Sequence, residues 1–154
     1  MTSTLEGKVP NILEREAQPT IERWLSRVDA EREIISIPLT AEERCAHLPE
    51  MLRDIVTRLR DPLPIGTRAL MSDAAHDHGC LRREQGYTAA MMVDESRMLQ
   101  VSIFETLQTH AVGLDTGDLL LDVMTIADEI DSQLAQAMNG YIIEANEDGA
   151  GIEG

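Results

Sequence analysis

The chain is poor in aromatic residues and lysine. Only 3% of its 154 residues are Phe, Trp or Tyr, which argues against the stacking surfaces that single-stranded nucleic acids need. Lysine occurs once, at Lys8, and no lysine or arginine follows Arg97, so the last third of the chain is strongly acidic. The formal net charge of −15 opposes contact with phosphate backbones and with anionic membrane surfaces. We therefore expect neither a nucleic acid nor a membrane as a partner.

Cysteine and long apolar runs are also scarce. The two cysteines, Cys45 and Cys80, are too few and too far apart for a disulfide framework or a zinc site. No segment approaches the roughly 20 apolar residues that cross a bilayer. The N-terminus lacks the basic and apolar regions of a signal peptide. We therefore expect a cytoplasmic protein.

What the chain does have is the composition of packed helices. Hydrophobic residues make up 43% of it, and eight of them are methionines. A core of Leu, Ile, Met and Ala suits helices better than a β-sandwich. We predict one all-α domain over residues 1–145, built as a bundle of about five helices, with a globin-like arrangement as the alternative. Residues 146–154 are predicted to form a flexible, acidic, glycine-rich tail or the start of a linker.

Hydrophobic periodicity predicts where the helices lie. They are expected at residues 11–30, 40–60, 67–84, 88–110 and 115–145, with a connector at 33–39. At Pro19 we expect a kink, or a short helix followed by a longer one, and at Pro49 a bend. Thr40 and Glu43 form a capping box at the start of the second helix. Gly86 suits the C-terminal cap of the third helix.

The most informative stretch lies around that glycine. It places polar side chains at helical spacings inside an apolar pattern, where burial without a partner costs about 2–7 kcal/mol. His78 and Arg82 are four residues apart and share one helix face. If the helices on either side of Gly86 form an antiparallel hairpin, Glu95 faces back toward Arg82 or His78. We predict a polar lock or a ligand site made of His78, Arg82, Gln85, Tyr87 and Glu95, and favour a lock that fixes helix register.

The sequence gives less support to metal binding, phosphotransfer, haem binding or catalysis. No two histidines stand four residues apart, so no metal site is predicted. His76 is a possible phosphoacceptor of a histidine phosphotransfer domain, although Asp77 stands where such domains usually have a basic residue. Haem bound by one histidine is a further alternative, which the shortage of aromatic residues disfavours. No catalytic triad or nucleotide-binding glycine loop is present, so we expect no enzyme activity and no cofactor.

At this stretch the sequence resembles the N-terminal domain family of the RsbT co-antagonists (RsbRD-like), found at the front of bacterial stress-signalling proteins and of some sensor histidine kinases. The residues that carry the resemblance are His78, Arg82, Gln85, Gly86, Tyr87, Glu95 and Leu99. Trp24-Leu25 and His47-Leu-Pro49 also resemble family positions, so the similarity covers most of residues 10–145. Ser96 stands where the family usually has an aromatic residue, and Gln100 where it usually has an arginine.

The resemblance implies a sensory or regulatory input domain of bacterial signal transduction and stress response. Such a domain would be non-enzymatic and homodimeric, and it would act through helix packing or dimer geometry. Its partner would be a kinase or a stressosome-type component. A histidine phosphotransfer domain and a globin-like sensor for haem or another small ligand stay open as alternatives.

Overall fold

The computed structural model describes residues 8–61, 63–66 and 71–152. All regular structure in these ranges is α-helical, which confirms the predicted fold class. The helices are α1 (Val9–Arg15), α2 (Ala17–Asp29), α3 (Arg32–Ile35), α4 (Ala41–Arg44), α5 (Leu48–Arg60), α6 (Asp73–Glu84), α7 (Ala89–His110) and α8 (Thr116–Ile152).

The first two predicted helices are each divided into a short and a longer one. The first divides at Glu16, whose backbone leaves helical geometry at φ −99° and ψ 21°. Pro19 lies in the first turn of α2, where its missing N–H costs no helical hydrogen bond. Pro49 likewise lies at the start of α5 instead of bending a continuous helix. The predicted capping box of Thr40 and Glu43 is present and begins α4.

The last two thirds of the chain follow the prediction more closely. Ser72 caps α6 through a hydrogen bond to the backbone of Ala75, while residues 67–70 of the predicted helix lie outside the described residues. The connector expected at residues 33–39 is partly helical, because the short α3 extends into it as far as Ile35. The prediction of a flexible tail from residue 146 needs correction, because α8 continues to Ile152. Once a long helix is nucleated, each further residue adds one hydrogen bond at small cost.

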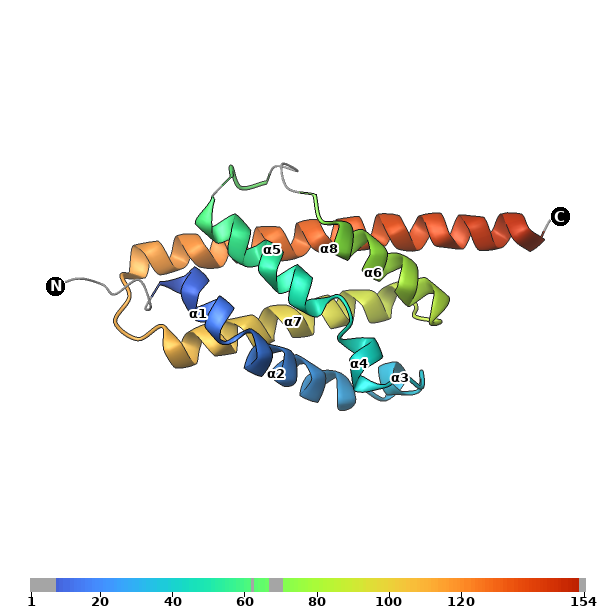
Figure 1. Ribbon diagram of the computed structural model, residues 1–154, viewed down its shortest axis with the longest axis horizontal. Helices are drawn as coiled ribbons and strands as arrows, with labels where there is room; N and C mark the ends of the chain where they lie inside the picture. Colours follow the sequence, from blue (N-terminus) through green and yellow to red (C-terminus); the bar gives the residue numbers. More distant parts are fainter. Residues whose placement is uncertain (1–7, 62, 67–70, 153–154) are drawn as a thin grey trace.

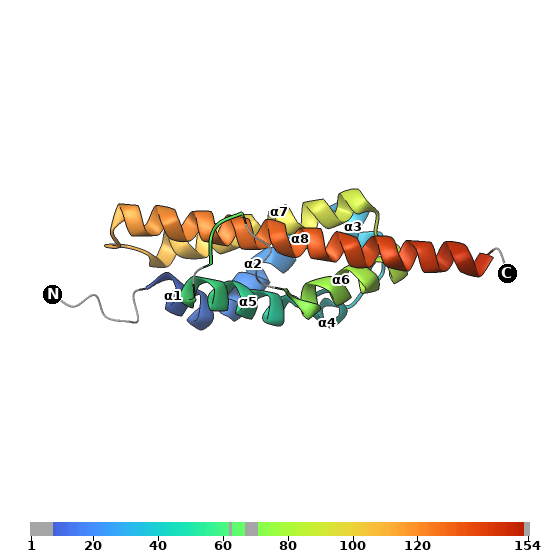
Figure 2. The same ribbon diagram turned by 90° about the horizontal axis from the view of Figure 1, so that it is seen from above.

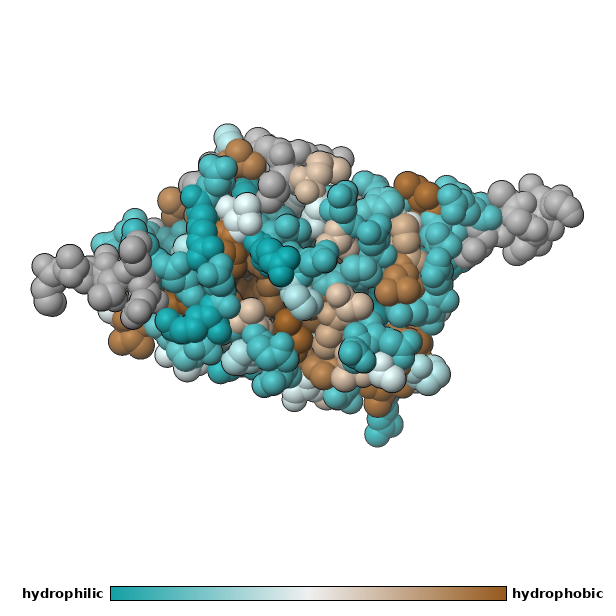
Figure 3. All heavy atoms as spheres, viewed as in Figure 1, coloured by the Kyte–Doolittle hydropathy of each residue, from teal (hydrophilic) through white to brown (hydrophobic). Residues whose placement is uncertain are grey.

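The helices form two layers. The long helices α7 and α8 lie antiparallel in one layer, and α1, α5 and α6 lie in the other (Figures 1 and 2). Both views show the C-terminal end of α8 extending beyond the other helices. Polar side chains cover most of the face formed by the second layer, and apolar atoms are visible in a hollow near its middle (Figure 3).

The closest packing between the layers joins α6 to α8. Gly79 of α6 and Gly140 of α8 lie where the two helices touch, and both are buried. A Cβ atom on Gly79 would collide with the backbone carbonyl of Ala137, and one on Gly140 with the carbonyl of His76. Glycine at these two positions thus lets the backbones of α6 and α8 touch directly, with no side chain between them.

Candidate functional site

The site centres on Glu95, in the second turn of α7, where only 3% of the residue is exposed. Arg82 Nε donates a 3.0 Å hydrogen bond to Glu95 Oε1, and the Tyr87 hydroxyl donates a 2.9 Å bond to Oε2. His78 Nε2 lies 3.6 Å from Oε1, which is too long for a good hydrogen bond. The strong pair is therefore the one between Arg82 and Glu95.

Arg82 has no exposed surface and uses its whole guanidinium group. Besides Glu95 it binds Gln85 Oε1 at 2.7 Å and the carbonyl oxygen of Arg44 at 2.7 Å. Its guanidinium carbon also lies 4.5 Å from the centre of the Tyr87 ring, in a cation–π contact. The structure thus brings together all of the residues predicted for the polar lock: His78, Arg82, Gln85, Tyr87 and Glu95.

Two further residues complete this network and were not predicted. Arg44 is buried and donates to the Tyr87 hydroxyl at 2.7 Å and to the carbonyl oxygen of Ile37 at 2.5 Å. Trp24 Nε1 donates to the backbone carbonyl of Glu95 at 3.0 Å. These contacts tie the hairpin of α6 and α7 to α2 and to the segment that joins α3 and α4. Seven side chains, which we call the Glu95 network, take part: Trp24, Arg44, His78, Arg82, Gln85, Tyr87 and Glu95.

Burial and charge set the protonation states of the network. Burial opposes ionisation of Glu95, but the nearby His78 ring, the charge of Arg82 and the hydrogen bond from Tyr87 hold its pKa below the usual value. Burial lowers the pKa of His78, so this imidazole is neutral at neutral pH. Burial and the Glu95 charge raise the pKa of Tyr87 to about 12. The network thus holds the Arg82–Glu95 ion pair and a second buried guanidinium, that of Arg44, which donates to the Tyr87 hydroxyl and to a backbone carbonyl; the other side chains are neutral.

The remaining histidines lie in different surroundings. His47 lies 31 residues before His78 in the sequence, yet its ring meets that of His78 edge to face with 5.5 Å between the centroids. His76 points away from the Glu95 network. Its side chain is 43% exposed, with Nδ1 3.8 Å from Asp77 Oδ1 and 3.9 Å from Cys80 Sγ. The candidate phosphoacceptor and the polar lock are therefore separate features of α6.

A second buried ion pair lies between α5 and α8 and was also missed. Arg58 donates to Glu129 at 3.1 Å and to Asp128 at 2.7 Å, and Asp128 accepts a further 3.0 Å bond from the backbone of Gly66. Burial raises the pKa of Glu129 above its usual value, and the hydrogen bond and charge of Arg58 offset only part of this rise. The sequence signal was an acidic residue among the apolar positions of the last helix, but its partner is 71 residues away.

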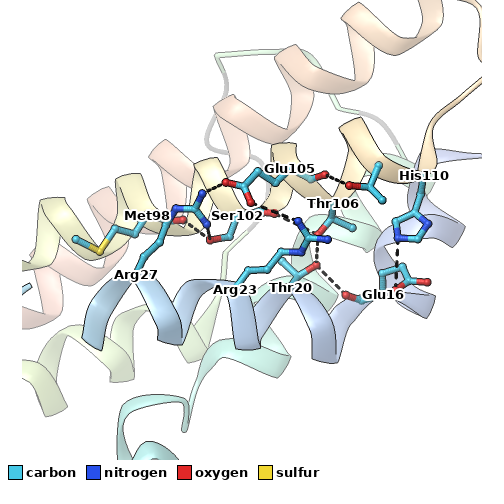
Figure 4. Close-up of polar contacts among 10 residues, drawn as sticks. Glu16, Thr20, Arg23, Arg27, Met98, Ser102, Glu105, Thr106 and His110 are labelled. Carbon is cyan, nitrogen blue, oxygen red and sulfur yellow. Dashed lines mark hydrogen bonds and ion pairs between the residues drawn. The ribbon is translucent and has the colours of Figure 1, made fainter. Parts of the chain in front are cut away.

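Polar contacts also hold α2 against α7 (Figure 4). The hydroxyls of Thr20 and Thr106 are 2.7 Å apart in the interior. Nearer the surface, Arg23 and Arg27 both reach the carboxylate of Glu105. All three charged side chains are about one third exposed, so solvent weakens these pairs to about 1 kcal/mol or less. We regard them as structural contacts between the two helices.

Several kinds of site are not found in the part of the chain that the structure describes. No group of three or more His, Cys, Asp or Glu residues there could hold a metal ion. None of the helices within residues 8–61, 63–66 and 71–152 is both long and apolar enough to span a bilayer. Both oxygens of Glu95 are engaged, so this carboxylate is not available as a general base. The Glu95 network is built for cohesion between helices.

Comparison of the chain with protein-family models, with curated proteins and with solved structures found no match. The resemblance to the RsbT co-antagonist N-terminal domains therefore stays a prediction that rests on the residues quoted for it.

Proposed function

We propose that this protein is a non-enzymatic sensory or regulatory input domain, in which the Glu95 network couples the hairpin of α6 and α7 to α8. In this account a signal changes the packing of α6, and α8 carries the change to the part of the protein or to the partner that responds. A buried ion pair with several partners suits such a role, because its arrangement is either complete or broken and has few intermediate states.

The observation that carries this proposal is the path from Glu95 to α8. Tyr87 donates to Glu95 through its hydroxyl, and its backbone carbonyl accepts a 2.8 Å hydrogen bond from the Tyr141 hydroxyl of α8. Arg83 adds a 3.3 Å bond to the same hydroxyl. Together with the direct backbone contact at Gly79 and Gly140, these bonds attach the C-terminal part of α6 to α8 at two places along the helix. A change at Glu95 therefore has a short physical route to the helix that projects from the bundle.

Self-association along α8 belongs to the same proposal. Leu120, Met124 and Ile142 are about half exposed. Residues 18 positions apart return to the same helix face after five turns, so these side chains share one face of α8 and form an apolar stripe that the exposed Asp131 interrupts. We propose a homodimer through this stripe, with a kinase or a stressosome-type component as the further partner. Light scattering should give twice the 17.1 kDa mass of one chain, and a mass of one chain at micromolar concentration would contradict the dimer.

We place this function in the cytoplasm. Both cysteines, Cys45 and Cys80, are free, as is usual in a reducing compartment.

Amide hydrogen exchange on Glu95→Gln tests the coupling. We expect faster exchange in α6 and also in α8 around Ala137 and Tyr141, because both helices lose the same support. Asp94→Asn is the matched control, since Asp94 is the neighbouring carboxylate and makes only an exposed 3.5 Å pair with Arg97. If α8 exchanges at the wild-type rate while α6 does not, the network has no effect on α8 and the proposal fails.

Histidine phosphotransfer is the second candidate function, and the exposure of His76 on a helix favours it. A kinase could reach this imidazole without unfolding any part of the domain. Asp77 beside it opposes an incoming phosphoryl group. Acid-labile phosphate on the wild type and none on His76→Gln, after incubation with histidine kinases, would support this function, and its absence from both proteins would remove it.

A further inference from the structure

A cavity of about 30 Å³ lies where α2, α5, α6, α7 and α8 meet. Eight of its twelve lining residues are apolar, among them Leu99 of α7 and Ile130 of α8. Glu95 and His78 also line it, so the cavity borders the Glu95 network. Ser96, which is only partly buried, lines it as well.

One residue that lines the cavity carries an unused hydrogen-bond acceptor. Gln133 of α8 lines it and is only 1% exposed. Its Nε2 donates a 2.9 Å bond to the carbonyl oxygen of Met51, but Gln133 Oε1 has no partner among the described residues. Exchanging the amide oxygen and nitrogen would bring two acceptor oxygens together, so Oε1 is the free atom. A buried acceptor without a partner is unfavourable, and a donor inside the cavity would relieve it.

These features define the kind of molecule that fits. One water molecule needs about 10–15 Å³ of such space, so there is room for roughly two or three non-hydrogen atoms. The apolar walls favour a short hydrocarbon part, and Gln133 Oε1 requires a donor. A net charge is excluded by the cost of removing it from water, because both oxygens of Glu95 and the guanidinium of Arg82 are already paired.

We propose that this cavity binds a small uncharged hydroxyl compound of the short-chain alcohol class, whose hydroxyl donates to Gln133 Oε1. The inference deepens the proposed function and rests on it for its regulatory meaning, since the ligand would touch the helices that the Glu95 network joins. The bound ligand would increase the population of the arrangement of α5, α7 and α8 in which the cavity is open.

The test compares ethanol with dimethyl ether, which has the same atoms but no hydrogen-bond donor. Methyl NMR spectra of the wild-type protein are recorded while each compound is added. We expect ethanol to shift the signals of Met51, Leu99 and Ile130 with a dissociation constant of about a millimolar or more, as suits three non-hydrogen atoms. The ether should bind about tenfold more weakly because it cannot donate to Gln133.

Variants assign the binding to this cavity. Gln133→Met keeps the length of the side chain but removes the acceptor, so the preference for ethanol should disappear. Ser96→Phe places a ring in the cavity and should abolish binding of both compounds. Gln100→Phe adds the same ring one turn along α7, outside the lining residues, and should leave binding unchanged. If Gln133→Met does not fold, the comparison of the two compounds on the wild type decides alone.

Two results would overturn the inference. If neither compound shifts the three methyl signals, the cavity holds water only; if both bind equally tightly to the wild type, Gln133 Oε1 is not the partner. The same experiments distinguish failure of this inference from failure of the proposed function. Binding of ethanol without any response of α8 to Glu95→Gln would leave the site in place and contradict the coupling.

Discussion

At the scale of single residues, the central feature is Glu95, whose partners come from α2, from α6 and from the turn between α6 and α7. Arg82, Tyr87 and His78 surround the Glu95 carboxylate, and Trp24 binds its backbone. Removing one member of a buried ion pair leaves the other charged and unpaired, which costs far more than losing an exposed pair. The network is therefore sensitive to single substitutions.

Glu95→Ala should lower the free energy of unfolding by about 3–5 kcal/mol, because it leaves the Arg82 guanidinium buried without its counter-charge. Asp94→Ala, at the neighbouring and half-exposed position, should cost less than about 1 kcal/mol. Urea unfolding of both variants measures the difference. A loss below about 1 kcal/mol for Glu95→Ala would mean that the pair contributes no more than a surface contact.

His78 should make the fold sensitive to mild acid. Because burial lowers the pKa of His78 in the folded state, the unfolded chain binds more protons than the folded one below pH 6.5 or so. The free energy of unfolding therefore falls as the pH decreases from about 6.5, with a slope of at most about 1.4 kcal/mol per pH unit for one histidine. The stabilising ionisation of Glu95, whose pKa is lowered, is lost only below about pH 4.5.

The measurement is urea unfolding of the wild type and His78→Gln between pH 5 and 7. We expect the wild type to lose stability faster than the variant as the pH falls. Groups that do not contact His78 contribute to both curves and cancel in their difference. Parallel curves would show that the His78 imidazole titrates alike in the folded and unfolded chains.

The residues of the site could be predicted only where their spacing along the chain is informative. His78 and Arg82 share a helix face, and the turn at Gly86 returns Glu95 to them, so this part followed from the sequence. Arg44 and Trp24 could not be found in this way. Their bonds to Tyr87 and Glu95 span 43 and 71 residues, and only the packing of α2 and α4 against the hairpin brings them close.

At the scale of the helices, sequence patterns located most elements but missed some of their ends. The apolar periodicity of residues 88–110 predicts α7 within one residue. The short helix followed by a longer one that was expected at Pro19 is present, with the break three residues earlier at Glu16. The division between α4 and α5 was not located, and Pro49 begins α5 instead of bending a continuous helix.

Gly79→Ala tests the contact between α6 and α8. In an exposed helix this change would stabilise by about 0.5–1 kcal/mol, but here the new Cβ would collide with the carbonyl of Ala137. We expect a net loss of about 1–3 kcal/mol, as for other over-packed sites. Gly117→Ala is the control, since that glycine is exposed in the first turn of α8 and should be neutral or slightly stabilising. A stabilising Gly79→Ala would mean that the helices are not in direct contact.

At the scale of the whole molecule, the arrangement follows from which helices can approach most closely. The glycine contact fixes α6 on α8, the hydroxyl pair and the arginines hold α2 on α7, and the Arg58 pairs join α5 to α8. The sequence predicted helices but not these layers, because each contact joins segments that are distant along the chain. The same reason hid the cavity beside Gln133, which exists only where five helices meet.

The central claim is that the Glu95 network controls how α8 packs on the rest of the bundle, and a distance measurement tests it most directly. Spin labels at Ser26→Cys on α2 and Ile143→Cys on α8, both exposed positions, report on this packing once Cys45 and Cys80 are replaced by alanine. The distance is measured for each variant under conditions in which circular dichroism shows that the variant is folded. We expect Glu95→Gln to shift the mean distance by about 2 Å or more, or to add a second population, as helix displacements do, while Asp94→Asn keeps the wild-type distribution. Identical distributions for the wild type and Glu95→Gln would contradict the account.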